Sequence, residues 1–472
     1  MSWHLALTVD RTARLPLAAQ IRGSLRKLIE NGTLRPDSRI PSSRQLAADL
    51  GVARSVVVEA YEQLAAEGYL VTRRGSGTRV AQSAKPPPGP ASSLLPAPVD
   101  VPEGTWDLRT GTSDTAAFPR QDWIRSVTAV LADAGRADLG YAPPSGVPLA
   151  RHVLVGYLGR VRGVRARPEN LMITAGFAQG LALLCKVLRE RGHDTVAVED
   201  PGHPGEWEFI AGAGLRPVGI LVDGDGMRVD LLAASGARVV LTTPGNQFPT
   251  GVRLSPERRE RLVAWARAVD GYVVEDDFDS AYLNRADRVP ALQSLAPDRV
   301  VYAGSASKVL APALRLGWLV APPELMASVE YARVGWDIGC SGIEQLALAH
   351  FISTGAYERH QRKLRTEFGR RRETVRAELP AHLPGAGILG GDSGLQAYIR
   401  LPPDTDEDGL VRTARSRSVL VRGGAFYTLA RDTPAPRTRP PAIVLSYAST
   451  PPDALRAALR ELGACYREVR RA

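Results

Sequence analysis

The sequence predicts two domains of different classes: a small helical domain with a two-stranded hairpin, and a large α/β domain with a mostly parallel sheet between helices. The large domain is indicated by short apolar runs typical of buried strands, such as residues 300–302. Polar residues that could bind a ligand or react with it follow these runs. The small domain is indicated by three short helical patterns within the first 80 residues. We place the small domain at residues 1–82, a proline-rich linker at 83–106 and the large domain at 107–472.

The composition is that of a globular protein with at least two domains. The chain has 472 residues, of which 44% are hydrophobic, enough to bury a large core. Neither an apolar run of 18 residues nor a signal peptide is present, so we expect a cytoplasmic protein without a membrane partner. Cys185, Cys340 and Cys465 are widely spaced and the histidines lack ligand spacing, so we expect neither a disulfide framework nor a metal site.

The first 80 residues alternate between helical patterns and turns. Apolar residues recur at helical spacing between Pro16 and Asn31, and Ser42 and Ser43 cap and open a second helix. A third helix is expected from about Arg54 to Glu67, followed by two short strands around a basic, glycine-rich tip. Three short helices and such a wing form a winged helix-turn-helix, whose third helix can enter a major groove. A small helical accessory domain with a hairpin is the alternative.

Charge distinguishes these two interpretations. Residues 1–80 contain 12 Lys and Arg against 7 Asp and Glu, which is +5 of the +10 net charge of the whole chain. Half of the net charge therefore lies in about one sixth of the length, as a DNA-facing domain requires.

Three segments of this region, Ile40–Val52, Ala60–Leu64 and Glu67–Leu70, resemble the DNA-binding domain of GntR-type regulators. The resemblance implies a double-stranded DNA operator as partner. The contacts that we expect are at Arg44, Arg54, Ser55, Arg74, Gly75, Ser76, Gly77 and Thr78. Ala53 departs from the family pattern because a serine usually caps the third helix at this position.

The stretch from Gly304 to Gly317 carries the most specific chemistry of the chain. Ser305, Ser307 and Lys308 follow an apolar strand, and Arg315 comes one short loop later. A lysine at the carboxyl end of a parallel strand can form a Schiff base with an aldehyde, and the hydroxyls and the arginine can hold a phosphate. Pyridoxal 5'-phosphate has both groups. A surface lysine after a strand is the alternative.

Two further segments supply what this cofactor needs. Asp276 ends an apolar strand and could pair with the protonated pyridine nitrogen, whereas Asp277 and Asp279 fit a helix cap or a solvated acidic turn better. The turn at Gly176-Phe177-Ala178 precedes an apolar helix expected from Gly180 to Leu188, and free N–H groups at a helix start can bind phosphate. The three segments together predict a pyridoxal-phosphate site.

The large domain also resembles a known family over about residues 107–470. The segments Leu139–Tyr141, Gln247–Gly251 and Glu275–Asp277, with the Ser-x-Ser-Lys motif, resemble the fold-type I pyridoxal-phosphate domain of aspartate aminotransferase, in the version found in MocR-type transcription regulators. The resemblance implies that Lys308 is the Schiff-base lysine and Asp276 the partner of the pyridine nitrogen. It implies that Ser305, Arg315 and the turn at Gly176, Phe177 and Ala178 hold the phosphate. We also expect Ser307 to contact the cofactor. Tyr141 would reach the phosphate of a neighbouring subunit, which implies a homodimer.

Three positions depart from the family pattern. His203 stands where a tyrosine usually stacks on the pyridine ring; a loop histidine in solvent is the alternative. Phe278 replaces a tyrosine that would donate to the 3'-oxygen of the cofactor, a role that would then fall to Gln247. Val444 stands where aminotransferases carry the arginine that binds the substrate carboxylate, and Arg422 is near enough in sequence to replace it.

We therefore expect a DNA-binding regulator rather than an enzyme, with at most weak residual transaminase activity. The loss of the arginine at Val444 favours pyridoxal phosphate itself as effector and vitamin B6 synthesis genes as targets. Two alternatives stay open. One is a regulator that senses an amino compound such as γ-aminobutyrate through external aldimine formation. The other is a working aminotransferase with an appended DNA-binding domain.

Overall fold

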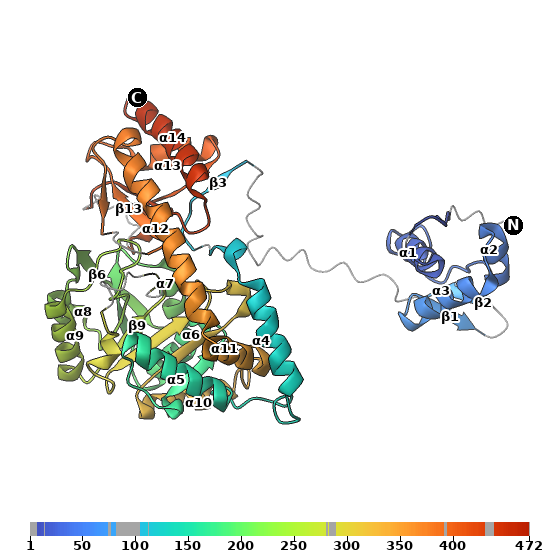
Figure 1. Ribbon diagram of the computed structural model, residues 1–472, viewed down its shortest axis with the longest axis horizontal. Coiled ribbons are helices and arrows are strands. Elements are labelled where there is room, and N and C mark those ends of the chain that lie inside the picture. The colour runs from blue at the N-terminus through green and yellow to red at the C-terminus, as the bar shows by residue number, and fades with distance from the viewer. Residues whose placement is uncertain are drawn as a thin grey trace. The chain divides into compact units, whose positions relative to one another are not determined.

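The computed structural model describes residues 7–13, 15–73, 77–81, 104–111, 113–279, 282, 289–390, 394–429 and 439–471. The chain divides into two compact units, Met1–Asp100 and Val101–Ala472 (Figure 1). Three residues of the expected wing tip, Arg74, Gly75 and Ser76, lie outside the described residues, as does most of the expected linker.

The small unit has three helices and a two-stranded hairpin, as the sequence predicts. Its elements are α1 (Leu17–Glu30), α2 (Ser43–Leu50), α3 (Arg54–Ala66), β1 (Leu70–Arg73) and β2 (Gly77–Val80). Ser42 caps α2 by accepting a hydrogen bond from the Gln45 N–H at 3.2 Å. Gly51 ends that helix in the left-handed conformation, with φ +62°, and so makes the tight turn into α3. One core, which includes Ile21, Leu64 and Val80, joins the helices to the hairpin.

Strands and helices alternate through most of the large unit. In chain order its strands and helices are β3 (Trp106–Asp107), α4 (Arg120–Asp133), α5 (Pro148–Arg162), β4 (Leu171–Thr174), α6 (Phe177–Glu190), β5 (Thr195–Asp200), α7 (Pro204–Gly212), β6 (Arg216–Asp223), β7 (Gly226–Met227), α8 (Leu232–Ser235), β8 (Val239–Thr242), α9 (Pro256–Ala268), β9 (Tyr272–Asp276), β10 (Val300–Ser305), β11 (Gly317–Val320), α10 (Pro323–Val334), α11 (Gly342–Ser353), α12 (Ala356–His382), β12 (Gly387–Leu389), β13 (Gln396–Arg400), α13 (Glu407–Ser416), β14 (Val419–Leu420), β15 (Arg422–Gly423), β16 (Ala442–Ser446) and α14 (Pro452–Val469).

The main sheet has the strand order β4-β11-β10-β9-β8-β5-β6-β7. Strands β10, β9, β8, β5 and β6 run parallel to one another. Strand β11 lies antiparallel between β10 and β4, and β7 is antiparallel to β6. Helices cover both faces of this sheet. Val274 and Val301 belong to one apolar cluster with residues of α6, whereas Val273 and Val300 belong to another with residues of α9. A strand buried on both faces reads as a continuous apolar run, which is why the sequence identified these strands.

A second, smaller sheet lies in the C-terminal part of the large unit. It has the order β12-β13-β16-β15, and its neighbouring strands are antiparallel. Helices α13 and α14 pack beside it, and the long helix α12 extends from the region of the main sheet to α14 (Figure 1). No described helix is long and apolar enough to cross a membrane.

The carboxyl ends of β9 and β10 position the chemistry of the large unit. In the parallel register Asp276 lies beside Ala303, so the acid at the end of β9 is next to the strand that leads into Ser305 and Lys308. Ligands of open α/β sheets bind outside such carboxyl ends.

Candidate cofactor site and nucleic-acid interface

Most of the expected cofactor residues line one cavity of about 240 Å³. They come from segments that are far apart in the sequence: the start of α6, the turn before α7, the end of β9 and the segment after β10. These residues are Phe177, Ala178, His203, Asp276, Ser305, Ser307, Lys308 and Arg315. The fold therefore brings the aldehyde-binding, ring-binding and phosphate-binding candidates together.

Lys308 is held inside this cavity. Its Nζ donates a hydrogen bond to the carbonyl oxygen of Gly111 at 2.8 Å. Burial lowers the pKa of Lys308 below its ordinary value, while the charges of Asp276 and Asp279 act against this shift. A lysine with a depressed pKa is more often the neutral amine, which is the form that attacks an aldehyde.

Asp276 is a buried carboxylate that suits a cationic partner. Burial raises its pKa well above the ordinary value, and the charges of Asp277 and Asp279 add to the shift, while Lys308 opposes it. From the residues that the structure describes, the Asp276 carboxylate accepts no hydrogen bond. The residue lines the cavity, where a ligand could supply the missing donor. The protonated nitrogen of a pyridine ring would supply that donor, so this residue fits the expected cofactor.

The structure corrects the expectation for the two neighbouring acids. Asp277 and Asp279 do not lie in a solvated turn. Asp277 forms a buried ion pair with Arg162 at 2.8 Å, which comes from the end of α5. Asp279 is buried, accepts a hydrogen bond from Asn246, and burial raises its pKa to about 8. The expectation failed because it treated the segment after β9 as surface, whereas α5 and the Asn246 loop cover it.

The phosphate candidates meet at the start of α6. Gly176 has φ +85°, and a Cβ on it would lie 2.8 Å from Nη2 of Arg315, so only glycine allows this approach. Arg315 itself has φ +49° and donates to the carbonyl oxygen of Ala175. The first N–H groups of α6, at Phe177 and Ala178, have no acceptor within the helix. Backbone donors and a guanidinium at one helix start are what a phosphate requires.

Helix α6 begins three residues earlier than the sequence indicated, at Phe177 rather than Gly180. Gly176 cannot cap it with a side chain, and no Ser, Thr, Asp or Asn marks the start. The side chain of Gln179, in the first turn of the helix, binds the preceding backbone instead: its Oε1 accepts the Ala175 N–H at 2.7 Å. The early start is what brings Phe177 and Ala178 to the cavity.

His203 lines the cavity, although much of the residue is exposed to solvent. Its ring lies 5.1 Å from that of Phe248, tilted by 44°. Burial, followed by the charge of Lys308, lowers the pKa of His203 to about 4. The flat ring of His203, in the same cavity as Lys308, can stack on a pyridine ring.

The structure also places Phe278, Gln247 and Val444. Phe278 lines the cavity and has no donor for a 3'-oxygen. Gln247 is not part of the cavity lining; its amide nitrogen donates to the carbonyl oxygen of Pro201 at 2.8 Å, and its Oε1 accepts from the Thr250 N–H at 3.2 Å. Val444 is fully buried in an apolar cluster with Phe248. Its direct neighbour across the β15–β16 pair is Arg422.

Sequence reasoning missed other parts of the cavity. Thr110 and Gly111 come from the segment after β3, and Glu206 comes from the first turn of α7. Burial and the charge of Asp276 raise the pKa of Glu206 well above its ordinary value. Acidic residues are common in the first turn of a helix, because the helix dipole favours negative charge there. The sequence therefore did not mark Glu206 as a site residue.

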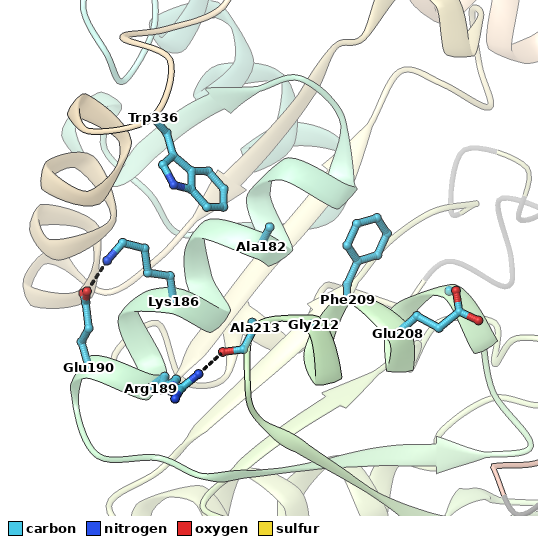
Figure 2. A pocket seen from close by; sticks show the side chains of 10 residues that line it. Ala182, Lys186, Arg189, Glu190, Glu208, Phe209, Gly212, Ala213 and Trp336 are labelled. Atoms are coloured by element: carbon cyan, nitrogen blue, oxygen red, sulfur yellow. Dashed lines mark hydrogen bonds and ion pairs between the residues drawn. The ribbon is translucent and has the colours of Figure 1, made fainter. Parts of the chain in front are cut away.

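A larger pocket, of about 730 Å³, lies between α6 and α7 (Figure 2). None of the expected site residues lines it. Lys186 pairs there with Glu190, and Arg189 donates to the carbonyl oxygen of Ala213 at 3.1 Å. Its cations are thus already engaged, and the chemistry lies in the smaller cavity. The described residues contain no cluster of His, Cys, Asp or Glu that could hold a metal ion.

The small unit presents the expected DNA contacts at its helix starts. Arg44, Arg54 and Ser55 are exposed in the first turns of α2 and α3. Arg54 Nε lies 3.4 Å from Oγ of Ser43, which joins the starts of the two helices. Ala53 provides no side-chain cap for α3, as its identity indicates. Gly77 and Thr78 are half-buried in β2.

Two families match the two units. Residues 17–80 match bacterial regulatory proteins of the gntR family, and residues 107–462 match aminotransferase class I and II. The chain is 32% identical to the HTH-type pyridoxine biosynthesis transcriptional regulator PdxR of Corynebacterium glutamicum, over 90% of this chain and 91% of that one. It is also 32% identical to the probable rhizopine catabolism regulatory protein MocR of Rhizobium meliloti, over 88% of this chain and 87% of that one. The chain belongs to the MocR-type transcription regulators of the GntR superfamily.

Solved structures confirm the aminotransferase fold of this MocR-type regulator. An archaeal alanine:glyoxylate aminotransferase superposes with a TM-score of 0.70 at 26% identity, over 77% of this chain and 91% of that one. A multiple substrate aminotransferase from Thermococcus profundus superposes with a TM-score of 0.71 at 24% identity, over 78% and 93%. Proteins of this fold class typically bind pyridoxal phosphate.

The pKa of Asp279 predicts how the stability of the MocR-type regulator depends on pH. Its folded pKa of about 8 exceeds the ordinary value of 3.8, so between about pH 4 and pH 8 the folded state keeps a proton that the unfolded chain has lost. This contribution to stability is complete below pH 4 and is lost as the pH rises to 8. We expect Asp279→Asn to become more stable relative to the wild type across this window, in urea titrations of cofactor-free protein.

Asp230 provides a matched control. It is exposed, and its hydrogen bonds with Arg228 lower its pKa to about 2. The stability of Asp230→Asn relative to the wild type should stay constant between pH 4 and 8. A constant difference for Asp279→Asn as well would contradict the assignment of the buried proton.

Proposed function

We propose that this protein is a transcription regulator of the cytoplasm that binds pyridoxal phosphate at Lys308 and controls vitamin B6 synthesis genes in response to it. The observation that carries the proposal is the convergence of Lys308, Asp276 and Arg315 on one cavity. The named role of the PdxR relative in pyridoxine biosynthesis supports the choice of target genes.

Each wall of the cavity has a role in this proposal. Lys308 would attach the aldehyde as a Schiff base, Asp276 would pair with the ring nitrogen, and His203 would cover the ring. Arg315, with Ser305, Ser307 and the turn at Gly176, Phe177 and Ala178, would hold the phosphate. When bound, the cofactor would supply an electron-withdrawing ring.

Val444 supports a regulator over an enzyme. Binding the carboxylate of an amino acid takes a bidentate cation, and the expected position is instead an apolar residue within a buried cluster. We therefore propose at most residual transamination. The position of Arg422 directly opposite Val444 favours an amino-compound sensor as the second candidate.

For the small unit we propose a DNA interface made by Arg44, Arg54 and Ser55 at the helix starts and by Gly77 and Thr78 of the wing. The same interface includes the expected wing-tip residues Arg74, Gly75 and Ser76. The exposure of the helix-start side chains and the concentrated positive charge support this assignment.

We also propose a homodimer formed through the large unit. Tyr141 is 92% exposed and Trp336 is 55% exposed, and Leu139 and Ile338 beside them are exposed too. The two segments adjoin, since a Cβ on Gly339 would lie 3.4 Å from the carbonyl oxygen of Pro143. Large apolar side chains gathered on one surface indicate an interface.

Lys308→Ala should abolish cofactor attachment. The wild type mixed with pyridoxal phosphate should show a Schiff-base absorption band, and borohydride should fix the cofactor to the peptide that contains Lys308. The chain has only five lysines, so peptide mapping is unambiguous. Lys186→Ala, whose lysine pairs with Glu190 outside the cavity, is the matched control and should keep the band. A band that persists in Lys308→Ala would refute the assignment.

The full chain should sediment as a dimer, at twice its mass of 50.7 kDa. Trp336→Asp combined with Ile338→Asp should shift it to the monomer, because two charges would be buried in the interface. Leu221→Asp is the control: this exposed leucine is on β6, at the other end of the main sheet from β4. A wild-type monomer, or a double variant that remains dimeric, would exclude this surface.

Pyridoxal phosphate alone should change the affinity of the protein for its operator, measured by fluorescence anisotropy at fixed salt. The reason is that a ligand shifts an equilibrium only if it binds one arrangement of the protein better than the other. Lys308→Ala should lose most of this response. If the cofactor changes nothing and an amino compound then changes the affinity strongly, the protein is an amino-compound sensor instead.

The same assay tests the DNA interface. Arg54→Met should weaken operator binding by about 1–3 kcal/mol and reduce discrimination against altered sites, the size of a lost base contact. Arg125→Met, an exposed arginine of α4, should change nothing. Equal losses for both variants would argue against the assigned interface.

A further inference from the structure

The large unit begins, along the chain, with a segment that forms part of the cofactor cavity. We call residues 107–111 and 113–114 the entry segment; it follows the expected linker directly and leads from β3 to a short 3-10 helix, Thr115–Ala117. Thr110 and Gly111 of this segment line the cofactor cavity. Movement of the entry segment would therefore change both a wall of the cavity and the place where the linker joins the large unit.

The entry segment is held firmly at one end and lightly at the other. Asp114 forms an ion pair with Arg371 at 2.8 Å, and both side chains are buried. Separating them would leave a buried charge without a partner. Towards the linker, β3 pairs with β14 over two residues, and Leu108 continues this pairing through its N–H and carbonyl oxygen. So short a pairing gives little stability by itself, so the end next to the linker depends on contacts further along the segment.

The residues expected to bind the cofactor supply two of these contacts. Lys308 Nζ donates a hydrogen bond to the carbonyl oxygen of Gly111 at 2.8 Å. The hydroxyl of Ser113 donates to the carbonyl oxygen of Ser307 at 3.0 Å. The Ser-x-Ser-Lys motif, which would attach the cofactor, is thus bonded directly to the segment that connects the large unit to the linker.

We infer that attachment of the cofactor breaks the hydrogen bond between Lys308 and Gly111, and that the loosened entry segment carries this change to the linker. The inference rests on the proposed function, because it requires that Lys308 bind the aldehyde. In that reaction a C=N bond to Nζ forms and the C=O bond of the aldehyde breaks. The oxygen leaves as water with both hydrogens of the neutral amine. A proton that the nitrogen takes up afterwards is shared with the neighbouring 3'-oxygen of the ring, so Gly111 loses its donor.

The remaining contacts keep the entry segment close to the cavity. Ser113 retains its bond to Ser307, and the hydroxyl groups of Thr110 and Tyr427 lie 2.8 Å apart. The segment should therefore loosen rather than detach. The loss of one hydrogen bond changes an equilibrium about threefold to tenfold. A change of this size lies within the range by which effectors shift binding equilibria.

Hydrogen–deuterium exchange of the full chain, read by mass spectrometry of peptides that contain residues 106–114, tests this inference. Lys308→Met removes the donor without any cofactor. The N–H groups of Trp106 and Leu108 should then exchange about threefold to tenfold faster than in the cofactor-free wild type, because the short pairing opens more often. Wild type loaded with pyridoxal phosphate should show the same acceleration. Ser294→Ala, which loses a hydroxyl bond to a backbone carbonyl outside the cavity, should leave these N–H groups unchanged.

Operator affinity tests the consequence for DNA binding. Without cofactor, Lys308→Met should bind the operator with the affinity that pyridoxal phosphate gives to the wild type, and added cofactor should change nothing further. Ser113→Ala, which breaks the neighbouring contact, should shift the affinity in the same direction by a smaller factor. An affinity of Lys308→Met equal to that of the cofactor-free wild type would overturn the inference.

The Schiff-base absorption band separates this inference from the proposed function. A wild type that shows the band while exchange in residues 106–114 stays the same or slows would refute the role of the Gly111 contact alone. A wild type without the band would refute the proposed function, and with it the inference that rests on it.

Discussion

The parallel pairing of β9 with β10 is the constraint on which the cofactor cavity depends. It sets Asp276 beside Ala303 and so places the end of β9 next to the strand that leads into Ser305 and Lys308. A slip of one residue would exchange the faces of the strand. Glu275 would then replace Asp276, although Glu275 is already satisfied by the N–H groups of Leu292 and Gln293 at 2.9 and 3.0 Å. Because consecutive residues of a strand face opposite sides of the sheet, Glu275 binds backbone N–H groups whereas Asp276 is open to a ligand.

The electrostatics of the cavity make occupancy favourable. Burial raises the pKa of Asp276, Glu206 and Asp279. The charges of Asp277, Asp279 and Glu199 add to the shift for Asp276, while Lys308 is the cation that opposes it. Asp277 adds to this crowding, even though Arg162 binds it. A ligand with a protonated ring nitrogen would stabilise the charged form of Asp276. Since such a ligand binds the folded state alone, it would also stabilise the fold.

The fold class and the residues of the cofactor motif could be predicted because their signals are local. Apolar runs mark strands buried on both faces. Asp276 ends one such strand, Lys308 comes three residues after another, and Arg315 lies in the short connection to the next. What failed depends on contacts between distant residues. Asp277 was taken for solvated because its partner, Arg162, is 115 positions away. Glu206, Thr110 and Gly111 carry no pattern of their own, and the pairing of Arg422 with Val444 exists only in the sheet register.

That register also determines what the wall beside the cofactor cavity is made of. The residue of β16 that lies across from Arg422 is Val444, which packs in an apolar cluster with Phe248, a residue of the cavity wall. The ring of His203 lies 5.1 Å from the ring of Phe248. An apolar wall offers no partner to the carboxylate of a substrate, whereas a ring bound beside His203 would contact it favourably. If occupancy fixes the position of this wall, the cofactor stabilises one arrangement of the protein over another, which is what a regulator requires.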